Sequence, residues 1–206
     1  MTEQPRGRLV ALEGIDGCGK STQARRLAES LGADLTFEPG ATGLGRALRA
    51  LLLDPDRPPP SARAEALLMA ADRAEHVEAV IRPALEAGRW VVTDRFAGST
   101  LAYQGWGRGL ADGPLRQVVA WAAGGVEADL SIFVDVPPAV ARERLAGLRP
   151  DRLERLDPAF HERVRHGYVA LARAEPARWA RVDGTPTADE VAEAVAAVVS
   201  GRLGLP

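Results

Sequence analysis

Residues Gly14–Ser21 read Gly-Ile-Asp-Gly-Cys-Gly-Lys-Ser and match the phosphate-loop pattern G-x-x-x-x-G-K-[ST] in full. Such a loop requires a buried strand before it and a helix after it, so the motif constrains the fold to the α/β class. Its Lys20 is the single lysine of the chain, and every other long basic side chain is arginine. A compact ammonium fits between phosphates where a planar guanidinium does not. We therefore interpret the loop as a phosphate site rather than as a glycine-rich turn without a ligand.

The chemistry of the loop indicates a nucleoside triphosphate. Backbone N–H groups from Asp16 through Ser21 are expected to converge on the β-phosphate, at the positive end of the following helix. The Ser21 hydroxyl is expected to bind Mg²⁺. The predicted nucleotide-binding residues of the loop are Gly14, Ile15, Asp16, Gly17, Cys18, Gly19, Lys20, Ser21 and Thr22. The motif alone leaves open whether the phosphoryl group passes to water, to a small molecule or to a protein.

Composition limits the remaining possibilities. The 206 residues with 46% hydrophobic content suit one domain, residues 1–206. A net charge of −2 with scattered arginines argues against a nucleic-acid surface. The chain shows no signal-like start and no apolar run long enough for a membrane span, so we expect a cytoplasmic protein. The single cysteine, Cys18, is either a small residue filling a tight turn or a thiolate favoured by the helix N-terminus.

Strand-like and helix-like segments alternate along the chain, which predicts a five-stranded parallel sheet flanked by helices, with ligands at the carboxyl ends of the strands. The expected strands cover Arg8 to Glu13, Asp34 to Phe37, Trp90 to Thr93, Leu130 to Val136 and Trp179 to Val182. The expected helices cover Lys20 to Leu31, Leu44 to Leu53, Ala62 to about Ile81, a turn from Pro83 to Gly88, Leu115 to Ala123, Ala139 to Leu145, Phe160 to Ala174 and Asp189 to Val199.

Further motifs follow the phosphate loop in a fixed order. They are Phe37-Glu38-Pro39-Gly40-Ala41-Thr42, Arg49, Ala70-Ala71-Asp72-Arg73, Asp94-Arg95-Phe96, Ser99-Thr100, Tyr103-Gln104-Gly105 and the late Asp151-Arg152-Leu153-Glu154. Together they resemble thymidylate kinase of the bacterial type along nearly the whole chain. The resemblance implies a three-layer P-loop kinase fold with a short mobile lid at about residues 146–157. It also implies a homodimer that phosphorylates dTMP to dTDP with ATP and Mg²⁺, and no covalent intermediate.

The resemblance also implies roles at matching positions. Arg95 would bridge the acceptor phosphate and the transferring phosphoryl group, Asp16 would lie near the sugar 3′-hydroxyl and the metal, and Arg49 would hold the acceptor phosphate. Arg73 would donate to thymine O4, and Tyr103 would close over the 2′ position. The remaining implied substrate contacts are Glu38, Pro39, Met69, Ser99, Thr100 and Gln104, and Asp94 joins Ser21 at the metal.

The lid residues complete the implied site. In the resembling family, a catalytic arginine comes from either the phosphate loop or the lid, and the loop here contains none. Arg149 or Arg152 is therefore the expected source, and Arg144 matches an arginine near the adenine. The alternative is an exposed charged loop without a catalytic part.

Two departures from the family pattern keep a second kinase function open. Phe37 stands where an arginine is usual, and Met69 stands where an aromatic side chain commonly stacks on thymine. A thioether can still cover a ring, although less selectively. Another nucleoside monophosphate or deoxynucleoside kinase is therefore the runner-up. A nucleotide-dependent switch is a remote alternative, and a guanine switch is excluded because a chain without asparagine cannot contain N-K-x-D.

Overall fold

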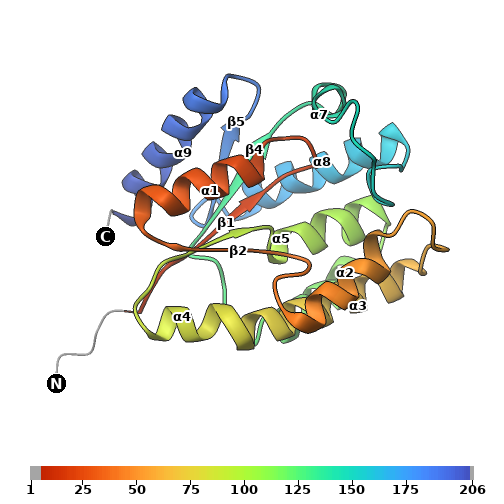
Figure 1. Ribbon diagram of the computed structural model, residues 1–206, viewed down its shortest axis with the longest axis horizontal. Helices are drawn as coiled ribbons and strands as arrows, with labels where there is room; N and C mark the ends of the chain where they lie inside the picture. The colour runs from red at the N-terminus through yellow and green to blue at the C-terminus, as the bar shows by residue number, and fades with distance from the viewer. Residues whose placement is uncertain (1–5, 205–206) are drawn as a thin grey trace.

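The computed structural model describes residues 6–204 and contains a central parallel sheet with helices on both faces (Figure 1). Its strands are β1 (Leu9–Glu13), β2 (Asp34–Phe37), β3 (Val91–Asp94), β4 (Leu130–Asp135) and β5 (Trp179–Asp183). They lie in the order β2-β3-β1-β4-β5, and every pair is parallel. The predicted five-stranded sheet and its α/β class are confirmed.

Alternation along the central strand explains why helices cover both faces. Leu9 and Ala11 of β1 pack with Ile81 and Leu85, whereas Val10 and Leu12 face the opposite way, toward the cluster that contains Leu27. Figure 1 shows α1 and α9 along one side of the sheet and the α3–α4 segment along the other.

The register brings the polar strand ends to one edge. Leu12 of β1 pairs with Asp94 of β3, and Glu13 pairs with Phe133 of β4. Residues that follow β1 and β3 in the sequence must therefore lie side by side. This edge contains the phosphate loop and Arg95.

Most helices match their predicted segments. Their bounds are α1 (Lys20–Leu31), α2 (Gly43–Leu53), α3 (Ala62–His76), α4 (Arg82–Glu86), α5 (Ala97–Thr100), α6 (Asp112–Ala122), α7 (Pro138–Arg144), α8 (Pro158–Ala174) and α9 (Ala188–Leu203). The long helix expected from Ala62 to Ile81 is α3 followed by the π-helical segment η1 (Val77–Ile81), and Ser61 caps it by accepting from the Ala64 N–H at 3.3 Å. None of the helices within the described range is long and apolar enough to cross a bilayer.

The helical stretch of α5 and the π-helical η2 (Leu101–Gly107) was not predicted. Its glycines disfavour a helix locally. The tertiary contacts explain them, because a Cβ at Gly98 would lie 2.5 Å from the Trp179 ring and one at Gly107 would lie 2.6 Å from the Phe160 ring. Close packing therefore selects glycine at positions where helix propensity would reject it.

Candidate active site

The phosphate loop leaves β1 and enters the N-terminus of α1, as the motif requires. Gly17 has φ +80°, and a Cβ there would lie 2.3 Å from the carbonyl oxygen of Ala141 in α7. Only glycine fits such a position. The N–H groups of the first turn of α1 have no partner within the helix, so they are available to an anion.

Lys20 is buried at the base of the loop and is 5% exposed. Its Nζ donates to the carbonyl of Ile15 at 3.4 Å and to Oδ1 of Asp16 at 3.2 Å. Burial and the charge of Arg95 would lower its pKa, but the Asp16 and Asp94 carboxylates outweigh them and the pKa of Lys20 is raised. The ammonium is therefore charged.

Asp16 and Arg95 form the centre of the site. The Arg95 guanidinium donates to Asp16 Oδ1, and the Tyr103 hydroxyl donates to Asp16 Oδ2 at 2.9 Å. Burial would raise the pKa of Asp16, but the charges of Arg95 and Lys20 hold it well below its usual range. The guanidinium also lies 5.0 Å from the centre of the Tyr103 ring.

The backbone of Arg95 is strained. Among the described residues, Arg95 is the only non-glycine with a positive φ, at 74°. The surroundings over-determine this conformation, because the Arg95 N–H donates to Leu12 O at 2.9 Å and its side chain donates to Gly14 O at 2.9 Å. Strain held in this way is common at functional sites. Here it directs the guanidinium across the mouth of the phosphate loop.

A buried carboxylate lies beneath Arg95. Glu13 accepts hydrogen bonds from the hydroxyls of Ser99 at 2.6 Å and Tyr168 at 3.2 Å, and both hydroxyls also accept from Arg95. Burial is the largest influence and raises the pKa of Glu13 to about 7. Glu13 was not predicted as a site residue, because its position at the end of a buried strand suggested only a core residue.

Ser21 and Asp94 meet beside the loop, since the Ser21 hydroxyl donates to Asp94 Oδ2. The other carboxylate oxygen, Oδ1, is buried and has no hydrogen-bond partner among the described residues. The Ser21 hydroxyl and the unpartnered Oδ1 of Asp94 are oxygen ligands of the kind that a hard divalent cation prefers. Such a cation would complete its shell with phosphate oxygens and water. The residues predicted for Mg²⁺ thus lie where they could hold it.

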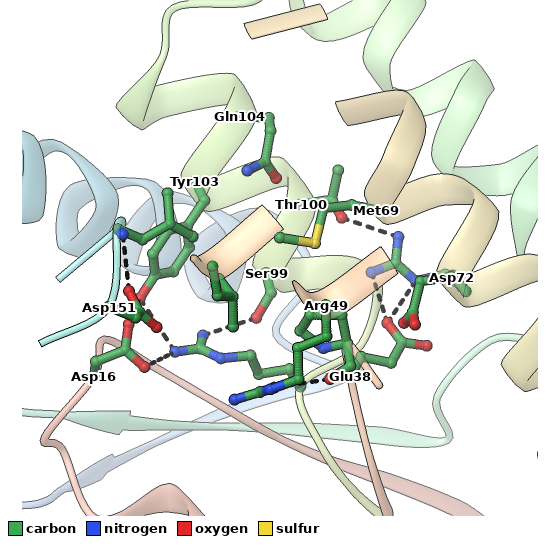
Figure 2. Close-up of a pocket in the computed structure, with 15 residues that line it drawn as sticks. Asp16, Glu38, Arg49, Met69, Asp72, Ser99, Thr100, Tyr103, Gln104 and Asp151 are labelled. Atoms are coloured by element: carbon green, nitrogen blue, oxygen red, sulfur yellow. Dashed lines mark hydrogen bonds and ion pairs between the residues drawn. The ribbon is translucent and has the colours of Figure 1, made fainter. Parts of the chain in front are cut away.

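Two concave sites share this centre. The phosphate cleft is lined by Asp16, Lys20, Ser21, Phe37, Glu38, Gly40, Ala41, Arg46, Arg49, Asp94 and Arg95. The deep pocket is lined by Asp16, Glu38, Pro39, Arg49, Leu53, Met69, Asp72, Arg73, Arg95, Ser99, Thr100, Tyr103, Gln104, Asp151 and Leu153 (Figure 2). All eleven predicted substrate contacts line the deep pocket. The two sites have Asp16, Glu38, Arg49 and Arg95 in common.

A buried ion pair forms one wall of the deep pocket. Arg73 donates from Nε to Glu38 Oε2 at 3.0 Å and from a terminal nitrogen to Thr100 Oγ1 at 3.0 Å. His76 also contacts Glu38, with Nδ1 3.0 Å from Oε1. The second terminal nitrogen of Arg73 donates to Phe96 O at 3.0 Å and also contacts Glu38 Oε2 at 2.8 Å, so a single N–H of the guanidinium remains for a ligand.

The two departures from the family pattern differ in their surroundings. Met69 lines the deep pocket, and Figure 2 shows its thioether beside Thr100. Phe37 lines the phosphate cleft and remains 44% exposed. Arg46 also lines that cleft and was not predicted. It provides a cation close to the place where the usual arginine is absent.

The predicted lid arginines lie apart from the loop. Arg149 is exposed and pairs with Asp56 at 2.8 Å. Arg152 is 7% exposed and donates to Leu52 O at 2.7 Å and to Glu65 Oε2 at 2.7 Å. Arg144 does reach the loop, because it donates to the carbonyl of Cys18 at 3.5 Å.

The structure favours the simpler interpretation of Cys18, a small residue that fills a tight turn. Cys18 is 1% exposed, and burial raises the pKa of its thiol. A buried thiol is inert compared with an exposed thiolate.

Two buried acidic residues near the pocket, Asp72 and Glu65, were not predicted as site residues. Asp72 lines the deep pocket and accepts from the Gly40 N–H at 2.9 Å. Glu65 is fully buried and contacts Gln104. Glu65 lies four and eight residues before Met69 and Arg73, so helical spacing would have placed the three on one face.

A family model described as thymidylate kinase matches residues 12–195. The chain belongs to the thymidylate kinase family. The family resemblance predicted from the motifs is thereby confirmed.

Individual thymidylate kinases match the chain over nearly its full length. The enzyme from Synechococcus sp. (strain RCC307) is 44% identical over 97% of this chain and 99% of its own length. The enzyme from Alkalilimnicola ehrlichii is 48% identical over 86% of this chain and 85% of its own. The crystal structure of thymidylate kinase from Ehrlichia chaffeensis superposes with a TM-score of 0.78 at 31% identity, covering 95% of this chain and 99% of that one.

Proposed function

We propose that the protein transfers the γ-phosphoryl group of ATP to the 5′-phosphate of dTMP, giving ADP and dTDP. The observation that supports this most directly is the meeting of the phosphate cleft and the deep pocket at Asp16, Glu38, Arg49 and Arg95. A donor phosphate at the loop and an acceptor phosphate at the pocket mouth would share the two arginines of this set, Arg49 and Arg95. In-line transfer between two bound phosphates requires this kind of adjacency.

The residues of the chain would act by positioning and by electrostatics. Lys20 and the loop N–H groups would hold the donor phosphates, and Arg49, whose guanidinium donates to Pro39 O at 2.8 Å, would hold the acceptor phosphate. Arg95, fixed by Asp16, would span both groups. The acceptor phosphate oxygen is already ionised at neutral pH, so its attack on the γ-phosphorus needs no general base. The bond from the γ-phosphorus to the bridging oxygen of ADP breaks as the new bond forms.

Two further groups would complete the catalytic site. Ser21 and Asp94 would hold Mg²⁺, which neutralises charge on the donor phosphates when it is bound. Segment 146–157 would act as a mobile lid that excludes water. We assign the catalytic lid cation to Arg149 rather than Arg152, because the Arg149–Asp56 pair is exposed and easily broken whereas Arg152 is buried against Glu65. Arg144 would lie beside the adenine.

The proposal includes a cytoplasmic homodimer. The apolar stripe of the helical stretch from Ala62 to Ile81 is one possible dimer face, but its Ala66, Ala70 and Ile81 are buried within the chain. Leu67 is 53% exposed and Leu51 of the neighbouring helix is 44% exposed, so the outer surface of α2 and α3 is the better candidate. Sedimentation of Leu67→Glu should show a shift toward monomer, and an unchanged sedimentation coefficient would reject this face.

One observation favours the second candidate function, a different nucleoside monophosphate kinase. Met69 lines the deep pocket where a stacking aromatic ring would be expected for a thymine base. A coupled assay with ATP and dTMP, dUMP, dCMP or dGMP distinguishes the two functions. We expect dTMP to have the highest kcat/KM and turnover to require an acceptor. A better acceptor among the others, or rapid hydrolysis of ATP without one, would refute the proposed function.

A further inference from the structure

Glu65 is a fully buried carboxylate that receives hydrogen bonds from three side chains. Gln104 donates from Nε2 to Oε1 at 2.9 Å. Arg108 donates to both oxygens, at 3.1 and 2.9 Å, and Arg152 donates to Oε2 at 2.7 Å. These donors come from η2, the residue that follows it, and segment 146–157. One carboxylate of α3 thus contacts both the deep pocket and the lid segment.

The charge of Glu65 decides which way the Gln104 amide faces. Burial would raise the pKa of Glu65, but the hydrogen bonds from Arg108, Gln104 and Arg152 lower it below its usual value. An ionised carboxylate can only accept hydrogen bonds. Gln104 must therefore present its NH₂ group to Glu65 and direct its oxygen elsewhere.

The oxygen of the Gln104 amide is available to a ligand in the deep pocket. Gln104 lines the deep pocket, and within residues 6–204 no group donates a hydrogen bond to its Oε1. Figure 2 shows the amide oxygen on the side of Thr100 and Met69 and the nitrogen turned away from them. The pocket is thus provided with a fixed hydrogen-bond acceptor.

A fixed acceptor distinguishes pyrimidine bases by the atom at position 3. Thymine and uracil carry an N–H there, which can donate to the Gln104 oxygen, whereas cytosine carries a lone pair that would face it. An amide free to rotate would present NH₂ to cytosine as readily as oxygen to thymine. Leaving a buried polar group unpaired is a strong source of discrimination.

We propose that Glu65 is a positioning residue that locks the Gln104 amide with its oxygen toward the acceptor base, so that the pocket selects bases with an N–H at position 3. The inference rests on the proposed function and deepens it. It assigns the thymine-against-cytosine choice to a side chain that does not line the pocket. Arg108 and Arg152 contribute by keeping Glu65 ionised.

The test compares kcat/KM for dTMP, dUMP and dCMP in the wild type, Glu65→Gln and Arg108→Gln. A neutral glutamine at 65 can donate as well as accept, so the Gln104 amide becomes free to turn. The dTMP/dCMP ratio should fall by about tenfold or more in Glu65→Gln. The dTMP/dUMP ratio should stay constant, because both bases carry the N–H. Arg108→Gln keeps the Gln104–Glu65 bond and the Arg152–Glu65 ion pair but removes one contribution to the ionisation of Glu65, so its dTMP/dCMP ratio should fall by less than in Glu65→Gln.

The outcomes separate this inference from the proposed function. A wild type that does not phosphorylate dTMP refutes the proposed function before any variant is considered. A wild type that prefers dTMP, with a Glu65→Gln variant that loses equal proportions of all three activities, overturns the positioning role alone. In a Gln104→Met background, Glu65→Gln should have no further effect on the ratio, and a further drop would also overturn it.

A measurement on the wild type covers the case in which Glu65→Gln does not fold. In ¹⁵N-labelled protein, the Gln104 side-chain amide should show a proton whose exchange with solvent is slowed by the bond to Glu65. Exchange as fast as that of an exposed glutamine would overturn the inference.

Discussion

Glu13→Gln offers the sharpest test of the electrostatics beneath Arg95. Glu13 is 0% exposed and accepts from the backbone N–H groups of Phe96 at 3.1 Å and Ser99 at 3.2 Å, besides the Ser99 and Tyr168 hydroxyls. Burial raises the pKa of this carboxyl from 4.5 to about 7, while the Ser99 hydrogen bond and the Arg95 charge oppose the rise. Glutamine has a similar shape and does not titrate.

The sign and size of the pH effect follow from this shift. Below pH 4.5, the carboxyl is protonated in both the folded and the unfolded chain, so it contributes no pH dependence. Between pH 4.5 and about 7, the folded chain keeps a proton that the unfolded chain has lost, so the free energy of unfolding decreases as the pH rises. Above pH 7 the decrease is complete and amounts to about 3 kcal/mol, at roughly 1.4 kcal/mol per pKa unit.

Urea unfolding of both proteins between pH 4.5 and 8.5 measures the effect. We expect the free energy of unfolding of the wild type, minus that of Glu13→Gln, to decrease by about 3 kcal/mol across this range. Asp72, whose pKa is raised to about 6 chiefly by burial, titrates in both proteins and cancels from the difference. A difference that does not change with pH would show that Glu13 is ionised at all these pH values and would refute the reasoning.

Two further predictions concern the cations of the site. Lys20→Arg should lower kcat about a hundredfold with little change in Tm, because a planar guanidinium cannot reproduce the compact ammonium that contacts Ile15 O and Asp16 Oδ1. Steady-state kinetics and a thermal melt check this, and full activity would contradict it. Arg149→Gln should lower kcat about tenfold or more without changing Tm, since its exposed ion pair contributes at most about 1 kcal/mol. Arg152→Gln should instead reduce the free energy of unfolding by about 3 kcal/mol, because it removes one partner of a buried carboxylate. Equal effects of the two arginine variants on kcat and Tm would argue against separate roles.

The local features of the sequence were sufficient for the strands, the phosphate loop and most helices. The strand from Leu9 to Glu13 and the glycine loop after it are encoded by neighbouring residues, so their pattern survives without tertiary information. The deep pocket was also predictable, because its motifs follow strand ends and helix turns that a parallel sheet gathers at one edge.

Helix α5 and the π-helical η2 were missed because their glycines serve long-range contacts. Helix propensity describes the chain alone, whereas Gly98 and Gly107 are selected by the aromatic rings of Trp179 and Phe160. The same limit applied to Arg95. Its φ of 74° results from hydrogen bonds to neighbouring backbone and has no local signal.

The sequence by itself determined that a phosphate-loop motif with Lys20 follows the first strand and that several arginines accompany it, which predicts a triphosphate site there. Only the tertiary structure decided which partners each charged side chain contacts. Arg149 and Arg152 are three residues apart, yet one is exposed beside Asp56 and the other is buried against Glu65. Glu13 and Glu65 carry no motif, and their roles arise from partners as distant as Tyr168 and Arg152. The physical reason is that burial and the charges around a group set its ionisation and its hydrogen bonds, and the fold alone fixes both.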